Sequence, residues 1–293
     1  MAAGASGLLG RSLCRHLTEQ GHQVTRLVRR EAGAGESRWD PYAGFVDFGL
    51  IADADAVVNL AGSPTAGNPH SKKWATELRN SRVTTTAVLA EAIAQAPTPP
   101  AFLAGNGISF YGDHGTDEVS ESSDSRGDAL LTQVTRQWQA ATVAASDAGA
   151  RVCVLRTAPV MDAGAPPLGP LRQLARLGLS TRLGSGRQYF PMISLRDWVG
   201  GVSFALAHDV SGPINLCCPV TPTNGEFTRA LADAVHRPAF LAVPAPVIKV
   251  AAGAMAPEVL GSLRAVPAAL LEAGYRFQDT DARDVIAAGL SGS

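Results

Sequence analysis

The chain has 293 residues, of which 46% are apolar and 17% are charged, and its formal net charge is −1 at pH 7. This composition excludes global disorder and leaves room for one large α/β domain, or a dinucleotide-binding domain with a second lobe. A net charge near zero removes the electrostatic argument for a nucleic acid or an acidic membrane as the main partner. We therefore expect a monomer or homodimer that acts on a small-molecule substrate.

The sequence offers no segment typical of a membrane span or a metal site. The most apolar late stretch, 240–257, contains three prolines and Lys249, which makes it a poor transmembrane helix. We find no cleavable signal peptide, and we expect a cytoplasmic protein. The cysteines follow no zinc spacing, so buried reduced thiols and no metal are expected; they are Cys14, Cys153, Cys217 and Cys218.

Short apolar runs alternate with amphipathic stretches through the first 160 residues. The predicted elements in chain order are a strand at 1–3, a helix at 11–20, strands at 23–28 and 54–60, a helix at 74–95, a strand at 101–105, a helix at 130–146 and a strand at 151–155. Alternation of this kind predicts an α/β fold, a Rossmann-type doubly wound parallel sheet with helices on both faces.

The texture of the sequence changes after Pro159. Residues 163–170 are rich in Gly and Pro, which marks a loop into a new region, and helices then outnumber strands. The expected division is a dinucleotide-binding domain at 1–160, to which 193–214 return, and a smaller, mainly helical substrate lobe made of 161–192 and 215–293.

A glycine run, Gly4-Ala5-Ser6-Gly7-Leu8-Leu9-Gly10, lies between the first strand and the first helix. Such a turn brings backbone amides and the helix N-terminus against a pyrophosphate. Gly4 permits the turn, Gly7 leaves room for the phosphates, and Gly10 lets the helix pack on the sheet. Because only three residues precede Gly4, we also expect a shortened first strand and a weakened cofactor affinity.

The end of the second predicted strand indicates which dinucleotide is bound. An acidic residue there would bind the ribose 2′-hydroxyl of NAD, whereas an arginine suits a 2′-phosphate. The sequence reads Val28-Arg29-Arg30, with no carboxylate at the strand end. NADP(H) is therefore the expected cofactor.

Further motifs along nearly the whole chain resemble one family. They are Trp39-Asp40-Pro41, Asn59-Leu60-Ala61-Gly62, Ser81-Arg82, Phe110-Tyr111-Gly112, Trp138, Leu155-Arg156-Thr157, Gly184-Ser185-Gly186-Arg187-Gln188, Thr223-Asn224-Gly225-Glu226-Phe227 and Glu272-Ala273-Gly274-Tyr275-Arg276-Phe277. With the glycine run, they resemble atypical extended short-chain dehydrogenases/reductases of the "epimerase family protein" group, which is nucleoside-diphosphate-sugar epimerase-like.

The resemblance implies roles for individual residues. Gly4, Ser6, Gly7, Leu8 and Leu9 would hold the pyrophosphate, Arg29 the 2′-phosphate, Asp40 the adenine, and Leu60, Ala61 and Gly62 the adenosine side. Pro159 and Val160 would lie near the nicotinamide, and the loop 184–188, with Arg187 and Gln188, and the segment 193–197, with Ser194, would border the substrate pocket.

The usual catalytic groups of short-chain dehydrogenases are missing. No tyrosine has a lysine four residues later, and Leu131 and Thr135 stand at the places of that pair, which the resembling group itself generally lacks. The group commonly reads Ser-Ala-Ser-Ala-x-Gly-Tyr-Tyr-Gly after the fifth strand, and Asn106 replaces its second serine. Its Trp-Ile-His becomes Met192-Ile193-Ser194, which removes an imidazole.

Asn106, which could hold a substrate carbonyl, and Tyr111, which could donate a proton, are the remaining catalytic candidates. The leading hypothesis is an NADP(H)-dependent oxidoreductase or epimerase/dehydratase-like enzyme. A second is an NADP(H)-binding protein without redox turnover, and a third is a non-redox cyclase or lyase on the same fold.

Overall fold

The computed structural model describes residues 1–291, in which the chain divides into two compact units. The first unit comprises 1–106, 134–155 and 202–213, and the second 107–133, 156–201 and 214 onward. This division differs from the one expected from sequence, because the segments 107–133, 156–160 and 193–201 belong to the second unit, and only 202–213 return to the first. The second unit is also no smaller than the first.

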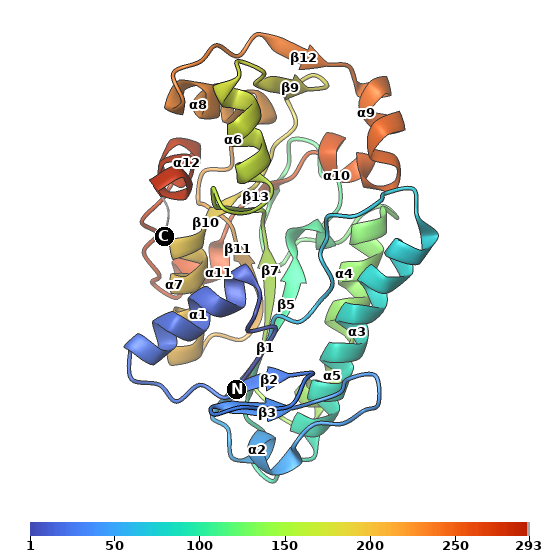
Figure 1. Cartoon of the computed structure of the whole chain (residues 1–293), viewed down its shortest axis with the longest axis vertical. Helices are drawn as coiled ribbons and strands as arrows, with labels where there is room; N and C mark the ends of the chain where they lie inside the picture. The colour runs from blue at the N-terminus through green and yellow to red at the C-terminus, as the bar shows by residue number, and fades with distance from the viewer. Residues whose placement is uncertain (292–293) are drawn as a thin grey trace. The chain divides into compact units, whose positions relative to one another are not determined.

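A seven-stranded parallel sheet has the strand order β11-β7-β5-β4-β1-β2-β3, which confirms the predicted Rossmann-type class (Figure 1). Its strands are β1 (Ala2–Ala3), β2 (Arg26–Val28), β3 (Glu36–Arg38), β4 (Ala56–Asn59), β5 (Ala101–Gly107), β7 (Val152–Thr157) and β11 (Gly212–Leu216). The order reverses between β1 and β4. The carboxyl ends of strands at such a switch point are where open α/β sheets bind ligands.

The first strand is as short as the sequence predicts. Both residues of β1 are buried, and the N-terminal ammonium of Met1 donates to the carbonyl of Ala56 at 2.6 Å. The amide of Ala2 donates to Thr25 at 2.9 Å. Strand β1 pairs with β2 and β4, which places the glycine run at the switch point.

Helices pack on both faces of the sheet in the first unit. The helices of this unit that precede β7 are α1 (Leu8–Glu19), α2 (Phe48–Ala52), α3 (Lys72–Ala94), α4 (Leu130–Ala140) and α5 (Val143–Asp147). The first residues of α4 belong to the second unit. Figure 1 shows α1 on one side of β1, and α3 and α5 on the other. Buried apolar side chains, among them Leu27, Val57 and Phe102, form the core of this unit.

The second unit is mainly helical, with three two-stranded pairings, β10–β8, β12–β9 and β13–β6. Its strands are β6 (Glu118–Val119), β8 (Val160–Met161), β9 (Thr181–Leu183), β10 (Ile193–Ser194), β12 (Leu241–Val243) and β13 (Arg264–Ala265). Its helices are η1 (Ile108–Phe110), α6 (Leu168–Arg176), α7 (Leu195–Ala207, which continues into the first unit), α8 (Asn224–Ala234), α9 (Ala245–Ala252), η2 (Gly253–Met255), α10 (Ala256–Leu260), α11 (Ala268–Glu272) and α12 (Ala282–Ser291).

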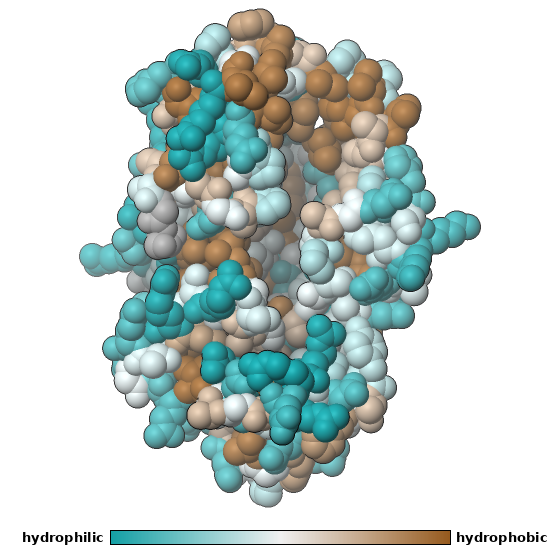
Figure 2. All heavy atoms as spheres, in the orientation of Figure 1, coloured by the Kyte–Doolittle hydropathy of each residue, from teal (hydrophilic) through white to brown (hydrophobic). Residues whose placement is uncertain are grey.

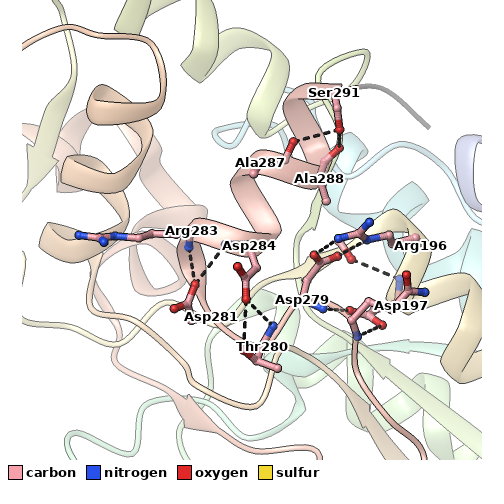
Figure 3. Close-up of polar contacts among 12 residues, drawn as sticks. Arg196, Asp197, Asp279, Thr280, Asp281, Arg283, Asp284, Ala287, Ala288 and Ser291 are labelled. Carbon is pink, nitrogen blue, oxygen red and sulfur yellow. Dashed lines mark hydrogen bonds and ion pairs between the residues drawn. The ribbon is translucent and has the colours of Figure 1, made fainter.

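A buried carboxylate joins the start of α7 to the segment before α12 (Figure 3). Asp197 has no exposed surface and accepts hydrogen bonds from the amides of Gln278 (2.9 Å) and Asp279 (2.7 Å) and the hydroxyl of Tyr275 (3.1 Å). Burial raises the pKa of Asp197, although these three donors oppose the shift. The neighbouring Arg196 forms an ion pair with Asp279. These contacts tie residues far apart in sequence into one folded unit.

Within residues 1–291, no helix has the length and hydropathy to cross a membrane, and no three His, Cys, Asp or Glu side chains are grouped to hold a metal. The four thiols are free. Burial raises the pKa of Cys153 to about 11 and that of Cys218 to about 12, so these two thiols are protonated at neutral pH.

Candidate functional site

The glycine run turns tightly against the end of β4. Gly4 has a φ of 75°, and a Cβ there would lie 2.4 Å from the carbonyl carbon of Leu60. A Cβ on Gly10 would lie 2.3 Å from the carbonyl oxygen of Gly4. Both positions therefore require glycine. The structure thus brings the predicted pyrophosphate residues and Leu60–Ala61 together.

Gly7 differs, because its Cβ would meet only the carbonyl oxygen of Gly4, at 3.5 Å. It is the N-cap of α1 and makes no side-chain cap, and the first turn of the helix has no acidic residue. The first amides of a helix have no acceptor within it and lie at the positive end of its dipole. This turn therefore fits a pyrophosphate, and the guanidinium of Arg11 further fixes it by donating to the carbonyl of Ser6.

The two arginines after β2 have different surroundings. Arg30 makes two hydrogen bonds of 2.7 Å to the carboxylate of Glu36, which holds the pKa of that carboxyl down at about 2. Arg26 lies 3.3 Å from the same carboxylate. Arg29 is exposed, and within residues 1–291 it has neither a hydrogen bond nor an ion pair from its side chain. Arg29 is therefore the arginine available to a phosphate.

Asp40 lies at the same edge of the sheet. The amide of Trp39 donates to the carbonyl of Val28 at 2.9 Å, which sets Asp40 just beyond the end of β3 and beside the end of β2. One carboxylate oxygen of Asp40 accepts from the amides of Tyr42 (3.1 Å) and Ala43 (3.2 Å), so the side chain shapes a turn. Its contact with adenine stays a prediction.

A buried network that the sequence did not predict holds the segment 60–62. The side-chain oxygen of Asn59 accepts from the amide of Ala61 at 3.0 Å, and its amide group donates to the hydroxyl of Thr86 at 2.9 Å. The indole of Trp138 donates to the same hydroxyl at 2.8 Å. Helices α3 and α4 thereby fix the predicted adenosine-side backbone. Asn59 and Trp138 had been noted only as motif residues.

Asn106, the candidate at the place of the catalytic serine, is buried at the end of β5. Its side-chain amide donates to the carbonyl of Thr135 in α4 at 3.1 Å. Asn106 therefore ties β5 to the helix that carries Leu131 and Thr135. An amide used in this way is a structural link, and its predicted contact with a substrate carbonyl stays a prediction.

Tyr111 lies in the core of the second unit, contrary to its expected role as a proton donor. It has no exposed surface; its hydroxyl donates to Asn215 at 2.7 Å and accepts from Arg156 at 2.7 Å. Burial raises its pKa to about 12, although the guanidinium of Arg156 opposes the shift. This placement argues against a proton relay through Tyr111, and we do not use one below.

Ser194, predicted to border the substrate pocket, is 1% exposed and caps α7 by accepting from the amide of Asp197 at 3.2 Å. The spacing Ser194-x-x-Asp197 is a capping signal that the sequence already contained. The structure does bring it close to the predicted nicotinamide residues, because β10 pairs with β8. Ile193 lies opposite Val160, and its amide donates to the carbonyl of Pro159 at 3.1 Å.

The loop after β9 separates its two predicted pocket residues. Gln188 is buried, and its amide donates to the carbonyl of Leu183 at 2.9 Å, so it stabilises the loop. Arg187 is exposed, and within residues 1–291 its guanidinium has no hydrogen bond or ion pair. Of the predicted pocket residues, Arg187 is the one free to bind an anionic group.

A groove in the second unit has a volume of about 740 Å³. It includes none of the predicted pocket residues. Its charged lining is mixed in sign, with Glu118, Glu226, Asp233, Asp281, Arg229, Arg264 and Arg283. We therefore rest the site on the glycine turn and Arg29 and not on this groove.

Comparison with known proteins agrees with this geometry. A model of the NAD dependent epimerase/dehydratase family matches residues 2–217, and a domain of unknown function, DUF1731, matches residues 243–288. The chain belongs to the NAD dependent epimerase/dehydratase family. This membership confirms the family that the sequence motifs resembled.

Proteins similar to this chain come from bacteria and from humans. "Epimerase family protein ML0860" of Mycobacterium leprae is 40% identical over 278 residues, which cover 94% of this chain and 90% of that protein. A crystal structure of human epimerase family protein SDR39U1 (isoform 2) with NADPH has a TM-score of 0.86 and 29% identity, covering 99% of this chain and 98% of that one. The nucleoside-diphosphate sugar epimerase from Corynebacterium glutamicum has a TM-score of 0.79 and 32% identity, covering 99% of this chain and 57% of that one.

A hydrogen bond between Ser109 and Glu258 joins η1, which follows β5, to the region matched by DUF1731. Ser109, at a position where the resembling group commonly has glycine, donates its hydroxyl hydrogen to Glu258 of α10 at 2.6 Å. Burial raises the pKa of Glu258, and the hydrogen bond from Ser109 opposes the shift.

A pH effect on stability follows from this pair. A carboxyl whose pKa is higher in the folded state has its stabilising contribution in full below its unfolded pKa and loses it as pH rises through the folded pKa. Glu258→Gln keeps an acceptor for Ser109 and cannot ionise. We expect its free energy of unfolding, relative to wild type, to be greater at about pH 8 than at about pH 4. Urea unfolding at both pH values measures this, and an equal difference at both would contradict it.

Proposed function

We propose that this protein binds NADP(H) and uses it in an oxidoreductase or epimerase/dehydratase-type reaction on a small molecule. The proposal rests on Arg29, whose side chain has no partner among the described residues 1–291. It lies at the edge of the sheet where the glycine turn lies, next to an Arg30 that Glu36 already neutralises. The NADPH in the human relative supports it.

The residues divide the work of holding the cofactor. The amides at the start of α1 bind the pyrophosphate, Arg29 pairs with the 2′-phosphate, and the backbone at 60–62 lies under the adenosine. The family resemblance assigns Pro159 and Val160 to the nicotinamide. When bound, the cofactor supplies a hydride donor or acceptor, while Arg187 orients an anionic part of the substrate.

Arg29→Ala is expected to weaken NADPH binding by about 10- to 100-fold, because a charge-assisted contact with a phosphate is lost. NADH has no 2′-phosphate, so its dissociation constant should stay within about twofold of wild type. Isothermal titration calorimetry of both cofactors measures the two constants.

Arg15→Ala is the matched control, since it removes one exposed positive charge from α1. It should leave the NADPH constant nearly unchanged. Equal weakening of NADPH by both variants would show only a general electrostatic effect. Equal weakening of NADPH and NADH by Arg29→Ala would also overturn the assignment.

A second function, NADP(H) binding without redox turnover, is favoured by the state of the candidate catalytic and pocket residues. Asn106, Tyr111 and Ser194 are all buried and hydrogen-bonded to other parts of the fold. The test is to load the protein with NADPH and follow its absorbance with a panel of carbonyl compounds and sugar nucleotides. Oxidation of NADPH by any compound of the panel would rule out this second function. Tight NADPH binding with no turnover across the panel would support it.

A further inference from the structure

Two segments of the second unit contain no Asp or Glu. They are 163–196 and 234–257, whereas the whole chain has 26 acidic residues among 293. Their basic residues are Arg172, Arg176, Arg182, Arg187, Arg196, Arg237 and Lys249. The net charge of −1 therefore conceals a strongly uneven distribution of charged residues along the chain. The expectation of no membrane partner was based on the net charge alone.

The fold places these two segments side by side. Strand β9 pairs in parallel with β12, with Thr181 opposite Leu241 and Arg182 opposite Ala242. The guanidinium of Arg237, after α8, donates to the carbonyl of Arg176 at the end of α6, at 3.0 Å. Arg176, Arg182 and Arg237 are thus gathered on one region with no carboxylate from either segment to neutralise them, whereas Arg196 is paired with Asp279.

Large apolar side chains are exposed on the same region. Leu177 is 73% exposed, Phe240 75% and Val250 77%. Leu179 and Val247 are also exposed, and Val247 and Val250 share a face of α9 at i, i+3 spacing. Figure 2 shows apolar residues gathered over β12 and α9. We call the exposed set Arg176, Leu177, Leu179, Arg182, Arg237, Phe240, Val247, Lys249 and Val250 the apolar–cationic face.

We propose that the apolar–cationic face docks on an anionic phospholipid surface. Exposed apolar side chains can enter the boundary between headgroups and acyl chains while Lys and Arg contact anionic headgroups. In a two-fold dimer formed through this face, each copy would present the same cations to the other, which disfavours a second copy as the occupant. A nucleic acid would leave the exposed Leu, Phe and Val side chains without a partner.

The experiment is cosedimentation of the full chain with vesicles. We expect binding to vesicles of equal parts phosphatidylcholine and phosphatidylglycerol and at least tenfold less to phosphatidylcholine alone. Binding to the anionic vesicles should weaken by at least about tenfold between about 0.05 M and about 0.5 M salt, because exposed charges are screened. No binding to anionic vesicles, or equal binding to both compositions, overturns the proposal.

Variants locate the contact. Phe240→Ser with Val250→Ser should reduce vesicle binding at least tenfold, whereas Val220→Ser, at another exposed valine (60%), should not. Arg176→Glu with Lys249→Glu should also abolish it, whereas Arg15→Glu with Arg38→Glu in the first unit should not. Thermal unfolding checks that all variants are folded. Equal loss in test and control pairs overturns the proposal.

Two further outcomes identify a different occupant. If the protein binds polyglutamate through this face but not anionic vesicles, the partner is an acidic polypeptide and the proposal is wrong. The protein could instead form a concentration-dependent dimer and not bind vesicles. If Phe240→Ser with Val250→Ser dissociates that dimer, the face binds a second copy of the chain and the proposal is wrong.

Discussion

Replacement of Gly4 by alanine is expected to destabilise the protein by about 3 kcal/mol or more, because strain and crowding add. The residue has a φ of 75°, which L-residues adopt at a cost, and the new Cβ would lie 2.4 Å from the backbone of Leu60. Backbone atoms cannot rotate away as a flexible side chain can. Urea unfolding measures the loss, and an unchanged midpoint would contradict the described turn.

Gly7→Ala is the matched control for that prediction. Its φ is −74° and its Cβ would meet only the oxygen of Gly4 at 3.5 Å, so stability should change by less than about 0.5 kcal/mol. The methyl group would nevertheless occupy space at the helix N-terminus where the pyrophosphate is proposed to bind. NADPH affinity should fall by at least about tenfold, which calorimetry measures. An NADPH affinity equal to that of wild type would show that the pyrophosphate does not bind at this turn.

Asp197→Ala is expected to cost about 3–5 kcal/mol of stability, because the variant deprives three donors of a buried acceptor. The carboxylate has no exposed surface and connects α7 to the amides of Gln278 and Asp279. Since these residues lead into α12, the loss should appear as a lower free energy of unfolding in urea. Figure 3 shows Asp197 beside Asp279, whose amide is one of the three donors.

Two comparison variants define the source of that loss. Asp147→Ala removes an exposed carboxylate from the end of α5 and should change stability by less than about 0.5 kcal/mol. Asp197→Asn keeps the shape and one acceptor oxygen, and should fall between the Ala variant and wild type. If Asp197→Ala were as stable as Asp147→Ala, the network would carry no net stabilisation.

Sequence patterns located most elements of the sheet and the helices that cover it, because each contains a run of apolar residues. The predicted helix at 74–95 corresponds to α3, and the predicted strand at 54–60 contains β4. Strand β3 was not predicted, because Glu36-Ser37-Arg38 has no apolar residue, and it becomes a strand by pairing with β2. The predicted helix at 130–146 is two helices, α4 and α5.

The sequence predicted the glycine turn of the site better than the arginines after β2. Gly4, Gly7 and Gly10 lie in the turn that their spacing predicted, and at Gly4 and Gly10 the close approach of backbone atoms demands glycine. Arg29 and Arg30 look equivalent in the sequence. Their difference comes from Glu36 on the adjacent strand, which pairs with Arg30 and leaves Arg29 free of ion pairs within residues 1–291.

The sequence by itself determined the α/β class, the glycine turn and the family, because these depend on local backbone preferences and on motifs read along the chain. Only the tertiary structure decided which polar side chains are engaged. Tyr111 is held by Asn215, Ser109 by Glu258, and Asp197 by the segment before α12. In these three cases the partner lies 82 to 149 residues away in the sequence, so local periodicity does not indicate whether the side chain is buried, paired or free.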